Sequence, residues 1–365
     1  MIEPLHLLDI PADAEHGWKY EAVHRLIVAS RLDSQGNTDL VPSVRSLAAD
    51  RANRLYCEQQ WILAVQGSQE VGWAQVGLPI HEDREKASIS VSVHPRMRRQ
   101  GIGSALLDWG ETLIAHANRT VMFSSVVYTP AEDHEPYLTT EEGSRVPVGA
   151  ASVAFSRKKG YALAHAERRS VLNVPMDPSL TQHLMEQTLP HTEGYRLHTW
   201  YDTIPQEWKE PFARLKEAFS SDAPQGALQF EQEHWNTERV DQMVRDIHGQ
   251  ENFFVMTAAE HVATGELAGF TELRWPQTPG EQAAEQWFTI VSRAHRGHRL
   301  GMWMKLANLG ELTSRCPEIR RVHTDNAQEN SHMLAINIAM GFTPNGGNAL
   351  MTKSVQRTPI PVRDA

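Results

Sequence analysis

The sequence predicts an α/β protein made of two domains with the same architecture in tandem. Its 365 residues fit two domains of ordinary size. Hydrophobic residues make up 41% of the chain, enough for each domain to bury its own core. The chain also contains an internal repeat, in which segments of helical periodicity alternate with short apolar segments that read as strands. Together, length, composition and repeat favour two mixed α/β domains.

The repeat is clearest around a basic, glycine-containing segment. From Val91 the chain reads V-S-V-H-P-R-M-R-R-Q-G-I-G-S-A-L-L, and from Thr289 it reads T-I-V-S-R-A-H-R-G-H-R-L-G-M-W-M-K. Arg98 matches Arg296 with a shift of 198 positions, counted from 98 to 296. Gly103 matches Gly301 with the same shift. An ordered repeat of this length predicts two related domains at 1–176 and 194–365, joined by a linker at 177–193.

Each copy is predicted to contain the same elements in the same order. In the first copy these are a helix at 18–31, strands at 61–66, 71–77 and 87–93, a helix after the basic turn, a strand at 121–128 and a helix that ends at Gly160. In the second copy a helix at 205–219, a strand at 286–291, a helix after the turn, a strand at 321–324 and a helix ending at Gly341 correspond to them. Only the first copy carries the polar, turn-rich stretch at 129–148, which is predicted to be a surface loop. Asp177-Pro178 is a possible start of a short helix in the linker.

Composition limits the classes of function. The net charge of −10 argues against a protein that binds nucleic acid through non-specific phosphate contacts. It mildly favours neutral or cationic ligands, although an acidic surface can also serve solubility alone. Cys57 and Cys316 are too far apart in sequence for a disulfide framework or a thiolate metal site. Because no signal-peptide pattern or apolar membrane-spanning stretch is present, we expect a cytoplasmic protein without a membrane partner.

The basic turn has a clear physical use. A glycine-containing turn that opens a helix directs several backbone N–H groups to one place, and the helix dipole adds positive potential there. Such a nest suits a pyrophosphate, and Arg96, Arg98 and Arg99 add charge to it. Taken alone, Gly101 and Gly103 fit an ordinary structural turn equally well.

The wider pattern resembles a known family. The series V-x-V-x-P-x-x-R-R-x-G-x-G-x-x-L-L is similar to the signature of the GNAT superfamily, the acetyl-CoA-dependent N-acetyltransferases. The second copy is similar through Arg296 and Gly301, but Arg299 stands where the first glycine of the signature belongs. Residues 324–342 look like the later Asn-rich strand and helix of the family, and the tandem layout is similar to that of mycothiol synthase. The resemblance covers most of both halves.

The resemblance implies a fold and a cofactor site. Each domain would contain a central, mostly antiparallel twisted sheet flanked by helices, with its fourth and fifth strands splayed apart and acetyl-CoA between them. The backbone N–H of Val93 or Val291 at the end of the fourth strand would polarise the thioester carbonyl. Pyrophosphate would lie on residues 98–104 or 296–302. The implied cofactor-binding residues are Val91, Val93, Arg98, Arg99, Gly101, Gly103, Ser104, Arg296, Gly297, Arg299, Gly301, Asn326 and Asn330.

The substrate amine is then expected to attack directly, which requires a base to take its proton. Glu272 is the candidate, because the first copy has Gln75 at the matched position and an amide cannot act as a base. The alternative is that Glu272 is a solvent-facing charge on an antiparallel strand. Glu285, Tyr128 and His323 are weaker candidates. The base favours the C-terminal half as the catalytic one, with Glu272 and Val291 as its catalytic groups.

The expected general acid is missing. Many family members place a tyrosine four residues before the closing glycine to protonate the departing thiolate. Here those positions hold Ser156 and Asn337, so the role is either empty or filled from elsewhere. A thiol of ordinary pKa near 8.5 is already a tolerable leaving group. His295 and His298 suggest a metal site by their spacing, but no third ligand is evident, and we expect no metal.

The sequence therefore predicts an enzyme that transfers an acetyl group from acetyl-CoA to the primary amine of a small molecule. Possible acceptors include an aminoglycoside-like compound, a polyamine, an amino-acid derivative or an amino-sugar conjugate. One alternative is a non-catalytic sensor or regulatory protein that binds acyl-CoA through a degenerate fold. Another is acetylation of a protein terminus or lysine. A monomer or a homodimer fits two fused copies.

Overall fold

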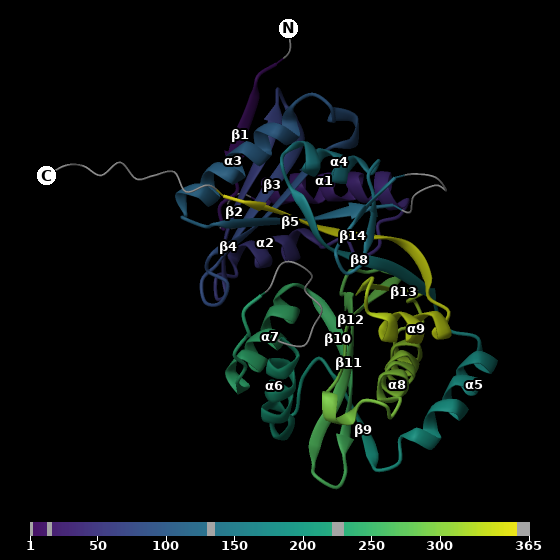
Figure 1. The fold of residues 1–365 in the computed structure, drawn as a ribbon. Coiled ribbons are helices and arrows are strands. Elements are labelled where there is room, and N and C mark those ends of the chain that lie inside the picture. Colours follow the sequence, from purple (N-terminus) through teal and green to yellow (C-terminus); the bar gives the residue numbers. More distant parts are fainter. Residues whose placement is uncertain (1–2, 13–16, 130–135, 221–229, 356–365) are drawn as a thin grey trace, which may run out of the picture. The chain divides into compact units, whose positions relative to one another are not determined.

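The computed structural model describes residues 3–12, 17–129, 136–220 and 230–355 (Figure 1). The contacts divide the chain into two compact units. Unit 1 comprises Met1–Thr140, Val146–His165 and Ala349–Ala365, and unit 2 comprises Glu141–Arg145 and Ala166–Asn348. The predicted fold class is confirmed, since each unit is a mixed sheet flanked by helices. The predicted boundaries at 176 and 194 stay a prediction, because these units are not consecutive stretches of chain.

Unit 1 has the strand order β1-β2-β3-β4-β5-β14. Only the β4–β5 pair is recorded as parallel, and β1 to β4 are antiparallel neighbours. Its elements in chain order are β1 (Leu5–Asp9), α1 (Gly17–Gln35), α2 (Val44–Ala52), β2 (Cys57–Gln66), β3 (Gln69–Pro79), β4 (Lys86–Val93), the 3-10 turn Pro95–Met97, α3 (Ile102–His116), β5 (Val121–Tyr128), α4 (Ala151–Lys158) and the start of β8 (Ala162–Asn173).

Unit 2 repeats this design with the order β8-β13-β12-β11-β10-β9. Again one pair, β12–β13, is parallel and the others are antiparallel. Its elements are the remainder of β8, α5 (Pro178–Thr188), the 3-10 turn Leu189–His191, β9 (Tyr195–Tyr201), α6 (Gln206–Ser220), α7 (Thr237–Gly249), β10 (Asn252–His261), β11 (Glu266–Pro276), β12 (Ala283–Val291), the 3-10 turn Arg293–His295, α8 (Leu300–Arg315), β13 (Arg321–Ala327), α9 (Ser331–Met340) and the start of β14 (Thr343–Ser354).

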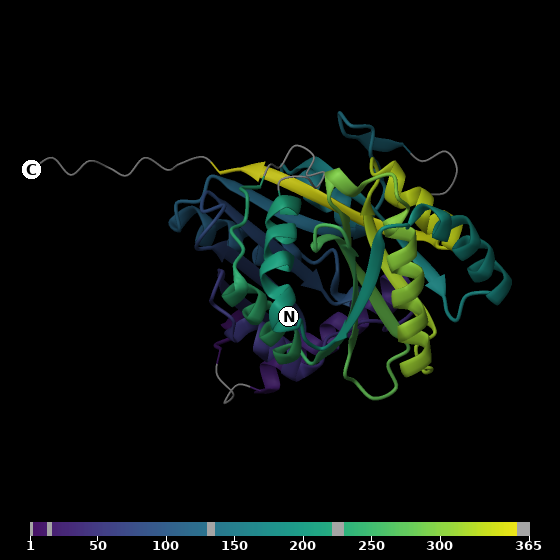
Figure 2. The same ribbon diagram turned by 90° about the horizontal axis from the view of Figure 1, so that it is seen from below.

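The sheet of unit 2 is covered on both faces, as the alternation of side chains along its strands requires. In β10, Phe254 and Met256 join the core beneath α6 and α7, while Val255 joins the core beneath α5, α8 and α9. Both views of the ribbon show α6 and α8 on opposite sides of these strands (Figures 1 and 2). In unit 1, Trp61 and Leu63 pack under α1 and α2, and Ile62 packs with Leu106 of α3. Each unit is therefore a three-layer sandwich of helices, sheet and helices.

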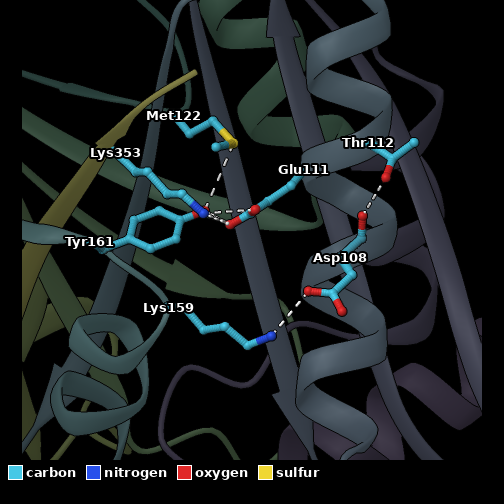
Figure 3. A network of polar contacts seen from close by, with 7 residues as sticks. All are labelled: Asp108, Glu111, Thr112, Met122, Lys159, Tyr161 and Lys353. Carbon is cyan, nitrogen blue, oxygen red and sulfur yellow. Dashed lines mark hydrogen bonds and ion pairs between the residues drawn. The ribbon is translucent and has the colours of Figure 1, made fainter. Parts of the chain in front are cut away.

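The two units exchange their last strands. Strand β8 follows the elements of the first copy, yet from Ala166 onward it belongs to unit 2, where it pairs with β13. Conversely, β14 follows the second copy, but from Ala349 it belongs to unit 1. Within unit 1, Lys353 of β14 forms an ion pair of 2.8 Å with Glu111 of α3, and the Tyr161 hydroxyl donates to the same carboxylate (Figure 3). The end of the chain is thus held in unit 1 by side chains as well as by strand pairing.

The predicted splay of the fourth and fifth strands is present in both units. Parallel pairing of β4 with β5 ends at Ser88 and Phe123, and that of β12 with β13 ends at Gln286 and Thr324. Beyond these points each fourth strand continues for five residues without that partner. In each unit the fourth and fifth strands therefore diverge from one another, and this unpaired region between them is called the wedge below.

The remaining elements follow the sequence predictions closely. Residues 177–193, predicted to be a linker, lie within unit 2 and contain α5, with Asp177 as its N-cap accepting from the backbone N–H of Ser179 at 2.7 Å. The stretch predicted as a surface loop contains two short paired strands, β6 (Tyr137–Thr139) and β7 (Arg145–Pro147), and its residues 130–135 lie outside the described part. Among the described residues, no helix is both long and apolar enough to cross a bilayer.

Candidate functional site

The basic turn adopts the same backbone path in both units. In unit 1 the two positions with left-handed φ are Arg99 (φ 65°) and Gly101 (φ 87°), and Gly101 is the N-cap of α3. In unit 2 the same two positions hold Gly297 (φ 90°) and Arg299 (φ 53°), and Arg299 caps α8. Neither N-cap residue makes a side-chain capping bond, so the first N–H groups of each helix point into the turn. The arginine in place of a glycine has not altered the shape of the nest.

A conserved contact between the two copies ties the turn to the fourth strand. The Nε of Arg98 donates to the carbonyl of Val93 at 3.4 Å, and the Nε of Arg296 donates to the carbonyl of Val291 at 3.3 Å. Arg98 also forms an ion pair of 2.6 Å with Asp33 of α1. In the structure, then, the first arginine of the motif anchors the turn on the strand end. Arg299 is exposed, and its guanidinium donates to the carbonyl of Gln187 at 3.3 Å.

The strand-end amides face the opening. Hydrogen-bonded pairs alternate along an antiparallel ladder. Ser292 N–H donates to the carbonyl of Ala268, so the preceding residue, Val291, turns its N–H and carbonyl away from β11. The same holds in unit 1, where His94 N–H donates to the carbonyl of Val71 and leaves the groups of Val93 directed away from β3. Both predicted thioester contacts therefore point toward the side on which the fifth strand has departed, and Val91 has the same orientation.

A β-bulge distinguishes unit 2. Glu272 pairs with Phe288 and Leu273 pairs with Gln286, so Trp287 has no partner on β11. The side chain of Gln286 donates to the carbonyls of Glu272 and Phe288 at 2.7 and 3.0 Å, which ties the bulge to both strands. The β3–β4 ladder of unit 1 runs without such a shift. Bulges of this kind re-aim side chains and are common next to active sites.

Glu272 lies beside this bulge on the face of the sheet covered by α6 and α7. It is fully buried, so the alternative of a solvent-facing charge is wrong. Its Oε1 accepts from the Nε of Arg274, and its Oε2 has no hydrogen-bond partner among the described residues. In unit 1 the matched Gln75 donates instead to Gln59 at 3.1 Å. Only unit 2 therefore carries a carboxylate oxygen available to a new donor at this position.

A buried lysine accompanies Glu272. Lys216 of α6 lies 3.8 Å from the ring centroid of Phe288 and 4.8 Å from that of Trp235. Burial lowers the pKa of Lys216 to about 8, and the negative charge of Glu272 partly opposes that shift. The Glu272 face of unit 2 thus combines one carboxylate, one lysine of lowered pKa and two aromatic rings.

The two asparagines predicted to contact the cofactor have partners within the protein. Asn330 is the N-cap of α9 and accepts from the backbone N–H of Met333 at 3.2 Å. Asn326 lies on β13 beyond the end of the parallel pairing and accepts from the side chain of Asn337 at 2.6 Å. Asn337 in turn accepts from the ammonium group of Lys305 at 2.8 Å. Asn326 is thus one end of a buried polar chain.

Two of the three weaker candidates for the base belong to unit 2 and one to unit 1. Glu285 pairs with His323 where β12 and β13 are still joined. Its charge acts on Glu167 of β8, whose pKa is raised to about 7 by burial first and by the nearby charge of Asp325 second. Tyr128 is buried at the end of β5 in unit 1. By strand register, Glu285 and His323 lie on the same face of the unit 2 sheet as Arg274 and Glu272, whereas Tyr128 belongs to unit 1. A cavity of about 300 Å³ beside β8 and α5 contains none of the predicted site residues.

The paired histidines have aromatic neighbours. Tyr195 hydroxyl and the Nδ1 of His295 are 3.0 Å apart, and the ring of His298 lies 5.2 Å from that of Tyr195. Burial, with a further contribution from His261, lowers the pKa of His295. Among the described residues no cluster of three or more histidine, cysteine or acidic side chains is placed to hold a metal.

Sequence reasoning missed Lys216 and Lys305, the two buried lysines of unit 2. A signal was present for Lys305, which interrupts the apolar stripe of α8 between Gly301 and Leu309. Lysines on such stripes usually extend their ammonium group to solvent, so the sequence alone gives no reason to single them out.

Comparison with known proteins agrees with this geometry. Residues 37–129 match the acetyltransferase (GNAT) family. The fold is similar to that of a tandem GNAT protein from the clavulanic acid biosynthesis pathway, with a TM-score of 0.75 and 25% identity, covering 96% of this chain and 98% of that one. A GCN5-related N-acetyltransferase from Sphaerobacter thermophilus gives a TM-score of 0.62 at 17% identity over 96% of this chain and 95% of its own.

A third similar structure belongs to a larger protein. It is the glucosamine N-acetyltransferase region of a fungal multi-domain β-N-acetylglucosaminidase, with a TM-score of 0.60, 12% identity and coverage of 97% of this chain and 38% of that one. No curated protein matches the chain in sequence.

The splayed strands and the helix-opening turn agree with these similarities, which support the GNAT superfamily and acyl transfer as the class of activity. The arrangement of two such units in one chain is similar to that of the tandem GNAT protein.

Proposed function

We propose that unit 2 transfers an acetyl group from acetyl-CoA to the primary amine of a small molecule. The observation that carries the proposal is the wedge between β12 and β13, into which the Val291 amide is directed. An N–H fixed at that point can donate to a thioester oxygen as negative charge develops on it. The residues present fit the diphosphate part of coenzyme A, because the turn before α8 offers uncapped helical amides and exposed arginines.

Glu272 supports the choice of unit 2. Its free Oε2 can accept a proton from the incoming ammonium group, and because the carboxylate is fully buried the transfer would pass through a water molecule. The bulge at Trp287, absent from unit 1, adds a second asymmetry on the same strand pair. Unit 1 keeps the turn and the wedge but has Gln75, which cannot serve as a base. Unit 1 is proposed to bind acyl-CoA or to support the fold without catalysing transfer.

The acceptor is proposed to be a small cationic amine. The rings of Phe288 and Trp235 already hold the ammonium group of Lys216, so this part of unit 2 is suited to a cation. The net charge of −10 favours the approach of cations. An amino sugar is one class to include, since a similar fold acts on glucosamine in the fungal protein.

Charge reversal in the two turns tests which unit works. Arg99→Glu and Arg299→Glu both alter an exposed arginine that already tolerates left-handed φ, so neither adds backbone strain. Release of free thiol from acetyl-CoA, measured with a panel of primary amines, should fall at least about tenfold more in Arg299→Glu than in Arg99→Glu, because a carboxylate there repels the diphosphate. Glu272→Gln, which copies Gln75, should lower kcat by about 10²-fold.

Two outcomes would overturn the proposal. A larger loss of turnover in Arg99→Glu than in Arg299→Glu would place the activity in unit 1. Tight binding of acetyl-CoA by the unaltered protein without thiol release for any amine would favour the non-catalytic acyl-CoA-binding protein.

A further inference from the structure

Lys305 is a buried cation without an acidic partner. Its side chain is 2% exposed, and among the described residues it forms no ion pair. Its Nζ donates to Asn337 Oδ1 at 2.8 Å and lies 4.0 Å from the sulfur of Met333. Burial is the cause that lowers the pKa of Lys305 to about 7. Burying an unpaired ammonium group costs free energy, so its presence requires another reason, such as an anion that appears only during function.

The position of Lys305 relates it to the wedge. Gly301 lies one helical turn earlier on the same face of α8. A Cβ atom at Gly301 would lie 4.0 Å from the side chain of Val291 and 3.3 Å from that of Ile336 on α9, so this face looks toward the end of β12. Through Asn337, Lys305 is also joined to Asn326 on the free part of β13. Lys305 therefore lies on the face of α8 that looks toward the end of β12, and through Asn337 it is connected to β13, the other strand of the wedge.

Unit 1 lacks this arrangement entirely. The position that matches Lys305, at the shift of 198, is Leu107, and the position that matches Asn337, at the shift of 181, is Ser156. Leu107 is buried in α3 as an ordinary core residue. The lysine and its asparagine partner thus occur together, and only in the unit that carries Glu272.

We propose that Lys305 is the proton donor to the thiolate that leaves when the acetyl group is transferred, with Asn337 as its positioning residue. The inference rests on the proposed function of unit 2. Attack of the amine forms a C–N bond and breaks the C–S bond, whose electron pair goes to sulfur. One N–H bond of the Lys305 ammonium group breaks and an S–H bond forms. The incoming ammonium group gives its first proton to Glu272 through water before attack. The second proton that the nitrogen loses as the amide forms goes to solvent, and Lys305 is reprotonated from solvent before the next turnover.

The side chains packed against α8 from the neighbouring elements are mainly apolar, so the pKa of Lys305 is set by burial. β10 and β11 turn Val255, Leu273 and Trp275 toward α8, and α5 contributes Leu184. The ionisable groups on β12, β13 and α9 are Glu285, Arg321, His323, Asp325 and His332, and the cause that lowers the pKa of Lys305 is burial rather than a charge on any of them. Asp325 is already paired with Arg169 at 2.9 Å.

The first test needs no turnover. Coenzyme A is bound to the protein and its thiol is titrated by the ultraviolet absorbance of the thiolate. An ammonium group beside the sulfur stabilises the thiolate, so the thiol pKa should be at least one unit lower in the unaltered protein than in Lys305→Leu. Leucine fits the position because unit 1 already has Leu107 there. Equal thiol pKa values in the two proteins overturn the proposal.

The second test uses the pH profile of kcat. The unaltered protein should lose activity as pH rises through the pKa of Lys305, and Asn337→Asp should move that limb to higher pH by adding a negative charge beside the amine. Lys305→Leu should lower kcat by about 10²-fold and remove the limb. Lys159→Met, which breaks an ion pair with Asp108 in unit 1 (Figure 3), serves as the control and should leave kcat and the profile unchanged.

The outcomes separate the two claims. A Lys305→Leu protein that keeps kcat within threefold (about 0.65 kcal/mol) and keeps its basic limb overturns the role of Lys305 while acetyl transfer stands. If no variant transfers an acetyl group but the pKa of the coenzyme A thiol still depends on Lys305, the proposed function is wrong. The contact between Lys305 and the sulfur then stands.

Discussion

Single residues carry most of the difference between the two units. Lys305 replaces a core leucine, Glu272 replaces a glutamine, and each is buried with few partners. A buried ionisable group lowers stability unless it is paired, so groups of this kind mark places where chemistry rather than packing has set the residue. The local sequence around both residues resembles ordinary strand and helix, which is why burial had to be seen before their roles could be argued.

The lowered pKa of Lys305 predicts how stability depends on pH. The ordinary value of 10.5 in the unfolded chain falls to about 7 in the folded protein, so between these values the unfolded state binds more protons. The free energy of unfolding should therefore rise as pH increases from 7 to 10, by on the order of 3 kcal/mol at most. Below pH 7 the buried charge is complete and its full cost applies.

Chemical denaturation of the unaltered protein and of Lys305→Leu at several pH values measures this effect. Lys305→Leu should be the more stable protein at pH 7, and its advantage should shrink toward pH 10. A constant difference over that range would show that Lys305 does not titrate in the folded protein as argued.

At the scale of elements, the turns before α3 and α8 have the same backbone shape, although their glycines occupy different positions. Each copy has one glycine and one arginine in the two left-handed positions, in opposite order. The second copy therefore lacks the first glycine of the sequence motif, although its backbone has the same conformation as that of the first copy. A left-handed residue with a side chain costs about 1–2 kcal/mol, which the surrounding contacts offset.

Replacing Gly101 by alanine tests this account. A Cβ there meets no atom within 4 Å, so only the strain of φ 87° acts, and the variant should lose about 1 kcal/mol of unfolding free energy. Gly249→Ala is the matched control, since its Cβ also meets open space but its φ is not left-handed. That control should be neutral or gain about 0.5 kcal/mol in denaturation experiments. Equal effects of both changes would contradict the strain argument.

At the scale of the whole molecule, the exchange of β8 and β14 makes each unit depend on chain from the other half. Ala349 and Met351 of β14 are fully buried, and Lys353 continues the strand with its ion pair to Glu111 (Figure 3). A fragment that ends with the first repeat would lack this strand. We therefore expect that the two repeats do not fold as two independent consecutive domains.

A pair of shortened chains measures this dependence. A chain ending at Asn348 should lose the strand and the Lys353 contact, and its thermal unfolding should occur more than about 10 °C lower than that of the full chain. A chain ending at Val355 keeps all described residues and should unfold within about 2 °C of the full chain. Similar unfolding temperatures for both shortened chains would show that β14 contributes little to unit 1.

The sequence by itself determined the class of fold, the repeat, the order of the elements and the turn that opens α3 and α8. These features depend on local periodicity and turn chemistry, which neighbouring residues encode. Only the tertiary structure decided that β8 and β14 change places, that the Val291 amide faces the wedge, and that Glu272, Lys216 and Lys305 are buried. Those facts depend on contacts between residues far apart in the chain, where pairing and desolvation rather than local preference set the outcome.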